Sequence, residues 1–130
     1  MTWRRFFLYI VPIVAHMGLI AFLSSRSDLP VGPPPFPGSD KVVHACLFGF
    51  LTFLMVRGWV AGQWQQINWT IVIGAIVATS LYGVTDEIHQ MFVPNRHPDV
   101  LDWVADTVGA LIVGTGLFFF AQKENGRQPE

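Results

Sequence analysis

The ionisable residues between Thr85 and Asp106 are the first candidates for chemistry in this chain. The stretch TDEIHQMFVPNRHPDVLDWVAD holds five of the nine Asp and Glu residues, together with His89, Arg96 and His97. Carboxylates and imidazoles in one stretch can bind a cation, transfer protons or bind a polar ligand. The apolar runs IVIGAIVATSLYGV and LIVGTGLFFF flank the stretch on its two sides. In a membrane protein, ionisable groups in such a place indicate a functional site.

The composition indicates that this is a membrane protein. Apolar residues make up 52% of the 130 residues and charged residues only 13%, whereas roughly 25% of a typical soluble domain is charged. A soluble chain of this length cannot bury so much apolar surface, because small domains bury a smaller fraction of their area. The net charge of −1 argues against nucleic acid as a partner, and the single cysteine, Cys46, excludes an internal disulfide.

The elements that position these residues are four apolar segments. A helical span needs about 20 largely apolar residues, and backbone groups in lipid must find hydrogen bonds within their own segment. The segments are Phe6–Leu23, Val42–Val60, Trp69–Val84 with its helix continuing to Gln90, and Val100–Ala121. We therefore predict an all-α fold, an integral membrane bundle of four transmembrane helices. Residues 1–122 form a single transmembrane domain and residues 123–130 a polar C-terminal tail.

The basic residues predict the orientation of these spans. With four spans, both termini and the middle loop lie on one side, which carries Arg4, Arg5, Arg57, Lys123 and Arg127. The other side carries Arg26, Lys41 and Arg96. The larger number of basic residues favours the cytoplasm for both termini, under the positive-inside rule. The proline-rich loop around residues 24–40 and the acidic stretch then face outward.

This topology brings the polar ends of several helices to one membrane face. We call the predicted group the polar cap and expect it to bind a ligand: Lys41, His44, Asp86, Glu87, Gln90, Arg96, Asp102 and Asp106. Asp102 and Asp106 are four residues apart and share a helix face. Glu87 points about one-third of a turn away from Asp86, so these two carboxylates are not a side-by-side pair. Asp106 lies inside the fourth span and should face a partner, for which Arg96, Lys41 and His44 are available.

Several of these polar residues also have structural interpretations. Asp99 and Asp40 are expected to cap a helix or to lie near the positive end of its dipole. His16 is expected to be a hydrogen-bonded packing residue. Glu87 and Arg96 can form an ion pair between the third helix and its loop. Close helix packing is the expected role of three glycines, Gly109, Gly114 and Gly116.

Three motifs follow one another in a specific order. They are Ser24-Ser25 after the first span, DKVVHACLFGFL from Asp40, and TDEIHQMFVPNR followed by LDWVADTVGA. In this order the chain resembles the VanZ-like family of membrane proteins over about residues 24–114. The resemblance implies a small multi-pass protein of the bacterial cytoplasmic (inner) membrane. It also implies an envelope role, since the founding member is associated with resistance to the lipoglycopeptide teicoplanin.

The family motif covers most of the polar cap in this chain. The matching positions are Asp40, Lys41, His44, Asp86, Glu87, Gln90, Arg96 and Asp102. Members commonly carry Asn at the position of Asp106, and small polar residues at His97-Pro98-Asp99. Asp106 therefore adds an acid near the expected site.

Three classes of function stay open. Our prediction is an outward-facing polar cap that binds a lipid-linked envelope component or a lipoglycopeptide, with apolar helices beside its lipid part. The second class is a membrane enzyme acting on a lipid-linked phosphate, because Arg96, Asp102 and Asp106 have a spacing similar to that of PAP2-type phosphatases. Asp102 would then be the nucleophile, and Lys41 with Arg96 would bind phosphate. The third class is ion or proton translocation, which intramembrane acids and His16 favour.

Metal binding is a related alternative. The candidate ligands for zinc are His44, Glu87, His89 and Asp102, and carboxylates alone suit magnesium or calcium. The sequence carries no HExxH or comparable spacing, so we predict no cofactor, while a divalent metal stays open. The expected partners are membrane lipids, and a second copy of the chain is an open alternative for enclosing a site.

Overall fold

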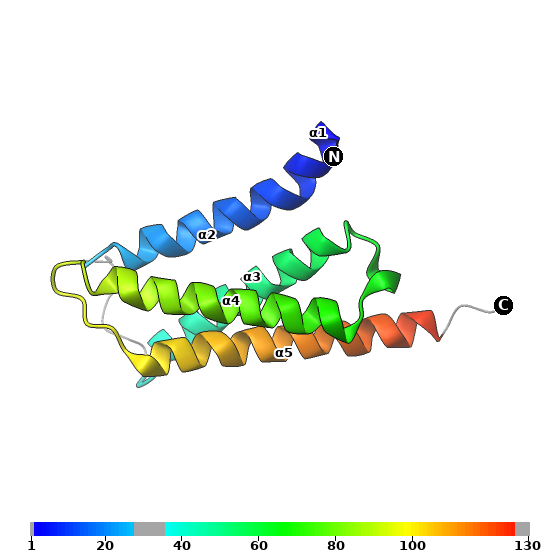
Figure 1. The fold of residues 1–130 in the computed structure, drawn as a ribbon. Helices are drawn as coiled ribbons and strands as arrows, with labels where there is room; N and C mark the ends of the chain where they lie inside the picture. Colours follow the sequence, from blue (N-terminus) through cyan, green and yellow to red (C-terminus); the bar gives the residue numbers. More distant parts are fainter. Residues whose placement is uncertain (1, 28–35, 127–130) are drawn as a thin grey trace.

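Four long helices in antiparallel order make up the part of the chain that the structure describes, residues 2–27 and 36–126 (Figure 1). In this computed structural model the first span runs from Trp3 to Ser24. Its parts are α1 (Trp3–Arg5), η1 (Phe6–Ile10) and α2 (Val11–Ser24). The other long helices are α3 (Ser39–Trp59), α4 (Trp69–Gln90) and α5 (Val100–Asn125). All four spans are long and apolar enough to cross a membrane, so the predicted fold class is confirmed.

Two helix boundaries differ from the predicted ones. α3 begins at Ser39, three residues before Val42, and α5 continues past Ala121 to Asn125. The predicted tail at 123–130 therefore starts as helix, because Lys123 and Glu124 favour helix and a lysine in the last turn suits the helix dipole. Residues 28–35 of the proline-rich loop and 127–130 of the tail, including Arg127, lie outside the described residues.

The core of the bundle lies between α3, α4 and α5, with α2 packed outside against α3 and α4 (Figure 1). α3 and α5 approach one another through small residues. A Cβ at Gly49 would lie 3.1 Å from the Gly109 carbonyl oxygen, and one at Gly109 would overlap the Ala45 carbonyl. Gly114 packs against Ile76. Close packing was predicted for Gly116 as well, and this is wrong, since nothing lies within 4 Å of a Cβ there.

The first span is bonded to α3 through the Leu8 carbonyl, which Pro12 leaves without its helical partner. Pro12 lacks an N–H and its ring conflicts with the carbonyl four residues earlier, that of Leu8. The helix is π-helical over Phe6–Ile10, and this segment ends two residues before the proline. Arg57 Nη1 donates to the Leu8 carbonyl at 2.8 Å, and the guanidinium lies 5.0 Å from the Tyr9 ring centre. Arg57, predicted as an anchor for orientation, thus also joins α3 to the first span.

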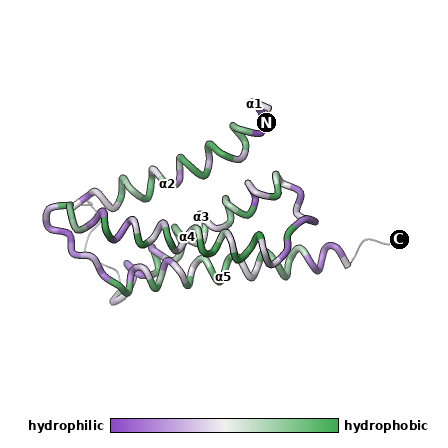
Figure 2. Tube along the Cα trace, viewed as in Figure 1, coloured by the Kyte–Doolittle hydropathy of each residue, from purple (hydrophilic) through white to green (hydrophobic). Residues whose placement is uncertain are grey.

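His16 joins α2 to the middle of α3. Its Nε2 donates to the Leu47 carbonyl at 2.9 Å, and its ring contacts the Phe50 ring edge to face. The predicted packing role is confirmed. Elsewhere the middle of the bundle is mostly apolar, whereas hydrophilic residues gather towards the helix ends and connections (Figure 2). One of these ends, where α2 and α4 finish and α3 and α5 begin, carries the polar cap.

Candidate functional site: the polar cap

Lys41 is the centre of an ion-pair cluster that joins α3 to α5. Its Nζ donates to Asp102 Oδ1 at 2.5 Å, to Asp99 Oδ2 at 2.6 Å and to Asp40 Oδ2 at 3.0 Å. The hydrogen bond from Lys41 also holds the pKa of the Asp99 carboxyl below its ordinary value. With three carboxylates around it, the lysine ammonium has little capacity left for another anion.

The two predicted helix caps have different outcomes. Asp99 is the N-cap of α5, and its Oδ1 accepts from the Leu101 N–H at 2.9 Å, so its capping role is confirmed. Asp40 is not an N-cap, because α3 starts at Ser39 and the N-cap is Gly38 at φ +83°. Glycine takes this left-handed conformation without strain. Asp40 instead lies in the first turn of α3, where a negative charge suits the dipole.

His44 lies between two aspartates of α5. Its Nδ1 donates to Asp106 Oδ1 at 2.9 Å, and its Nε2 lies 3.7 Å from Asp102 Oδ2. The ring is stacked on Phe48, with ring centres 6.2 Å apart. Asp106 is fully buried. Of the three partners that the sequence offered for this acid, the structure therefore selects His44, not Lys41 or Arg96.

Asp86 and Gln90 tie α4 to the end of α2. Ser24 Oγ donates to Asp86 Oδ2 at 2.7 Å, and Gln90 Nε2 donates to the same oxygen at 3.2 Å. All three side chains are buried. Next to them, Ser25 Oγ is 2.8 Å from His89 Nε2. Ser24 and Ser25, at the end of the first span, thus join α2 to α4 beside the cap.

Glu87 and Arg96 point to different partners. Glu87 Oε2 accepts from the backbone N–H of Asp99 at 2.8 Å, whereas Arg96 Nη2 donates to the Leu23 carbonyl at 3.4 Å. The predicted Glu87–Arg96 ion pair is therefore wrong for the described structure. The physical reason is that each side chain serves a helix end, since the first N–H groups and last carbonyls of a helix have no partners within it. Glu87 meets the start of α5 and Arg96 the end of α2.

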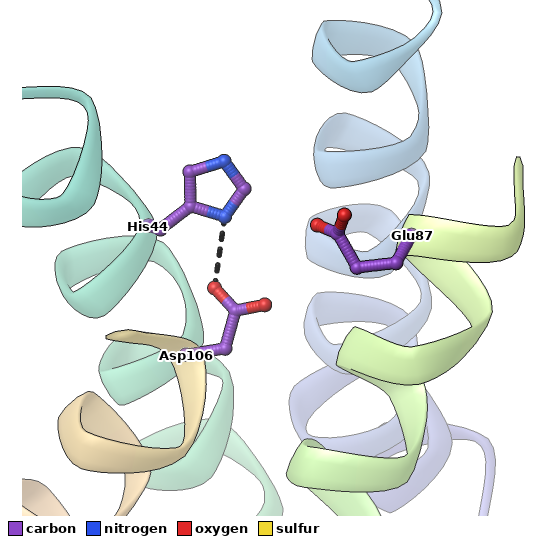
Figure 3. Close-up of side chains that lie close together, drawn as sticks. All are labelled: His44, Glu87 and Asp106. Carbon is purple, nitrogen blue, oxygen red and sulfur yellow. Dashed lines mark hydrogen bonds and ion pairs between the residues drawn. The ribbon is translucent and has the colours of Figure 1, made fainter. Parts of the chain in front are cut away.

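Two carboxylate oxygens at the floor of the cap have no hydrogen-bond partner among the described residues. They are Glu87 Oε1 and Asp106 Oδ2, and both are buried. One ligand atom from each of His44, Glu87 and Asp106 lies within 4.8 Å of the other two. Figure 3 shows the carboxylate of Glu87 facing the carboxylate of Asp106 and the His44 ring across a shared space. We call these three residues the buried triad.

Gly83 is a site residue that the sequence analysis missed. A Cβ at this position would lie 2.9 Å from Asp106 Oδ2 and 3.3 Å from Trp103 Cδ1, so a larger residue would have to displace the carboxylate. Its spacing in the sequence could have identified it, because Gly83 precedes Glu87 by four residues and shares its helix face. A glycine on the polar face of an otherwise apolar helix marks a close approach.

The predicted set of zinc ligands is not assembled in the described part of the chain. His44 and Glu87 come together, but His89 contacts Ser25 and Asp102 is held by Lys41. Asp106 completes the group instead. Helical spacing alone does not predict which of Asp102 and Asp106 joins His44 and Glu87, since both lie on one helix face. Asp106 does so because it lies deeper in the bundle.

An open apolar groove of about 280 Å³ runs beside Glu87 between α4 and α5. Its lining is formed by Val84, Glu87, Ile88, Met91, Pro98, Val100 and Trp103. The Trp103 ring is fixed because its Nε1 donates to the carbonyl and hydroxyl of Ser80 at 3.2 and 3.1 Å. An apolar wall thus adjoins a buried carboxylate, an arrangement suited to an amphipathic ligand.

The fold and the site together define a class of protein. Antiparallel apolar helices with ionisable side chains gathered at one end make this a multi-pass helical membrane protein with a polar cap. A family model described as VanZ/LLP1 matches residues 5–122. The chain belongs to the VanZ/LLP1 family, as its motifs indicated. Comparisons with curated proteins and with solved structures gave no match.

Proposed function

We propose that this VanZ-like protein acts in the bacterial cell envelope and contributes to resistance against lipoglycopeptides of the teicoplanin type. Its polar cap would face outward from the cytoplasmic membrane and bind an amphipathic, lipid-linked molecule. The observation that carries the proposal is the apolar groove, which places an apolar wall directly beside the buried carboxylate of Glu87. Family membership supports the same role.

The size of the groove indicates which part of a ligand it accepts. Ligand pockets usually enclose about 300–1,000 Å³, so the 280 Å³ groove holds an acyl chain rather than a whole lipoglycopeptide. Met91 at its rim is exposed and flexible, which suits chains of different shape. The polar part of the ligand would then lie over the cap, at the membrane surface.

The two alternative functions receive less support from the geometry. A lipid-phosphate enzyme needs free cationic groups to bind phosphate, but Lys41 contacts three carboxylates. Of the two predicted phosphate-binding residues, this leaves Arg96, which donates to the Leu23 carbonyl at 3.4 Å and whose Nε has no partner among the described residues. For ion translocation, the side-chain hydroxyls in the interior below the cap pair with one another and carry no titratable proton. Thr52 donates to Thr79 at 3.1 Å, and the Ser80 and Thr107 hydroxyls are 2.8 Å apart.

Drug susceptibility in a Gram-positive host tests the proposal, with membrane levels of each variant matched. We expect wild type to raise the inhibitory concentration of teicoplanin, and Glu87→Gln to lose this protection. Val84→Trp should fill the groove and also lose it. Leu81→Trp is the matched control, because Leu81 is exposed on the same helix and does not line the groove.

A glycopeptide without a lipid tail distinguishes binding in the groove from binding by the polar cap alone. Protection against teicoplanin but not against the tailless drug would support binding of the lipid part. Absence of protection by the wild type would refute the proposed function. Equal protection by wild type and Val84→Trp would refute the role of the groove.

A further inference from the structure

We propose that His44, Glu87 and Asp106 form a binding site for one divalent transition-metal cation of the zinc class, at the floor of the polar cap. The three side chains come from α3, α4 and α5, so the ion would join all three helices of the core. The proposal is independent of the envelope function above, since it concerns metal binding by the purified protein.

The separation of the ligand atoms suits a single ion. Nitrogen and oxygen atoms bound tetrahedrally to zinc at about 2.0–2.2 Å lie roughly 3.3–3.6 Å apart. The candidate atoms of the triad lie within 4.8 Å of one another. Side-chain rotations that shorten these separations by up to about 1 Å would bring the atoms to bonding distance.

The unpartnered oxygens point to a missing ligand. Asp106 is fully buried and Glu87 is 9% exposed, and each has one oxygen without a hydrogen-bond partner among the described residues. Burying a carboxylate oxygen without a partner is costly. Both carboxylates border the same space in Figure 3, and the glycine at position 83 keeps that space open next to Asp106.

Charge also favours a cation at this place. The nearest lysine, Lys41, is occupied by Asp40, Asp99 and Asp102. Buried acids in a membrane segment need a compensating partner; the described contacts provide His44 for Asp106 and a neutral backbone N–H, that of Asp99, for Glu87. A divalent ion would neutralise both carboxylates at once.

The donor set indicates the kind of metal. One imidazole nitrogen with two carboxylate oxygens suits zinc or a similar first-row ion, whereas magnesium and calcium prefer oxygen ligands alone. Asp102 Oδ2 lies 3.7 Å from His44 Nε2, on the side of the ring away from Asp106. Carboxylates that accept a hydrogen bond from the other ring nitrogen orient metal-bound histidines in other proteins, and Asp102 would take this role if it moved closer to His44.

Zinc binding to the full chain in detergent tests the proposal. The protein carries a tag without histidines, and zinc is titrated against a chromophoric chelator, with metal content and thermal unfolding measured in parallel. We expect stoichiometric zinc and a higher unfolding temperature for wild type, with no displacement by magnesium or calcium. Glu87→Gln and Asp106→Asn should lose affinity by more than the roughly 10–100-fold typical of outer-shell changes.

A matched control separates this site from other histidines at the same end of the bundle. His97→Gln removes an exposed histidine outside the triad and should bind zinc as wild type does. Gly83→Ala keeps all three ligands but crowds Asp106, so we expect weakened binding even if Asp106→Asn does not fold. Wild type without stoichiometric zinc would overturn the proposal and favour a proton between the acids. Unchanged affinity in Glu87→Gln and Gly83→Ala would overturn it as well.

Discussion

At the scale of single residues, the polar cap consists of two differently built halves. The outer half is the Lys41 cluster, whose ions are partly exposed to water. The inner half is the buried triad, where Asp106 is closed off from solvent. Exposed ion pairs contribute little to stability, whereas removing one partner of a buried pair leaves an uncompensated charge. The two halves should therefore respond differently to mutation.

The His44–Asp106 contact is predicted to be strongly coupled. His44→Ala should lower the free energy of unfolding by about 3–5 kcal/mol, because the buried Asp106 carboxylate loses its donor. In an Asp106→Asn background the same change should cost only about 1 kcal/mol, since no buried charge remains. Denaturation of the detergent-solubilised single and double mutants measures the difference. Additive effects would contradict a direct pair.

The Lys41–Asp99 ion pair should make stability depend on pH in the acid range. Because the pKa of Asp99 is lowered in the folded protein, its contribution is complete above its ordinary value of about 4. The contribution is lost as the pH falls through the lowered pKa. Asn keeps the N-cap oxygen, so Asp99→Asn isolates the charge. We expect its unfolding temperature to lie below that of wild type at neutral pH and to converge with it in acid. A difference that does not change with pH would argue against an ionic effect.

At the scale of elements, the closest contact is between α3 and α5, where small residues let the two backbones meet. Helix association in membranes depends on such packing, because lipid supplies no hydrophobic drive between helices. α4 packs against Gly114 of α5. The first span is joined to the core by hydrogen bonds at Leu8, His16 and Ser24. The ligands of the buried triad therefore depend on the α3–α5 approach for their spacing.

Gly109→Ala is predicted to separate α3 from α5. The added methyl group would overlap the Ala45 carbonyl, which belongs to backbone and cannot rotate away. Overpacking of this kind costs roughly 1–3 kcal/mol or more. Gly116→Ala is the matched control, because its Cβ would meet nothing within 4 Å. Thermal unfolding should show a lower midpoint for the first variant and an unchanged or higher midpoint for the second. The reverse order would contradict the packing described above.

At the scale of the whole molecule, the antiparallel order of the helices gives the bundle two chemically different ends. One end carries the polar cap, and the other carries both termini of the described chain and the connection between α3 and α4 (Figure 1). Basic residues are more numerous at the second end, which supports the outward orientation of the cap.

Cysteine labelling in intact cells tests this orientation. In a Cys46→Ser background, His97→Cys places a thiol at the cap and Gln65→Cys places one at the opposite end; both positions are exposed. We expect a membrane-impermeant thiol reagent to label position 97 in intact cells and position 65 only after permeabilisation. Labelling in the opposite order would place the cap in the cytoplasm and refute an extracellular ligand.

The sequence by itself determined the number and class of the spans. Lipid leaves backbone groups no partner except those in the same helix, so apolar length translates directly into transmembrane helices. Antiparallel order then required Lys41, Asp86 and Asp102 to lie at one end. The motifs around these residues also identified the family, which the match over residues 5–122 confirmed.

Only the tertiary structure decided which side chains meet inside the cap. Sequence spacing gives the face of a residue on its own helix but not the rotation of that helix or the identity of its neighbours. For this reason Glu87 was assigned to Arg96, whereas the backbone N–H of Asp99 is its partner. The placement of Asp106 beside His44, and the room that Gly83 leaves for it, likewise follow from the close approach of α3, α4 and α5.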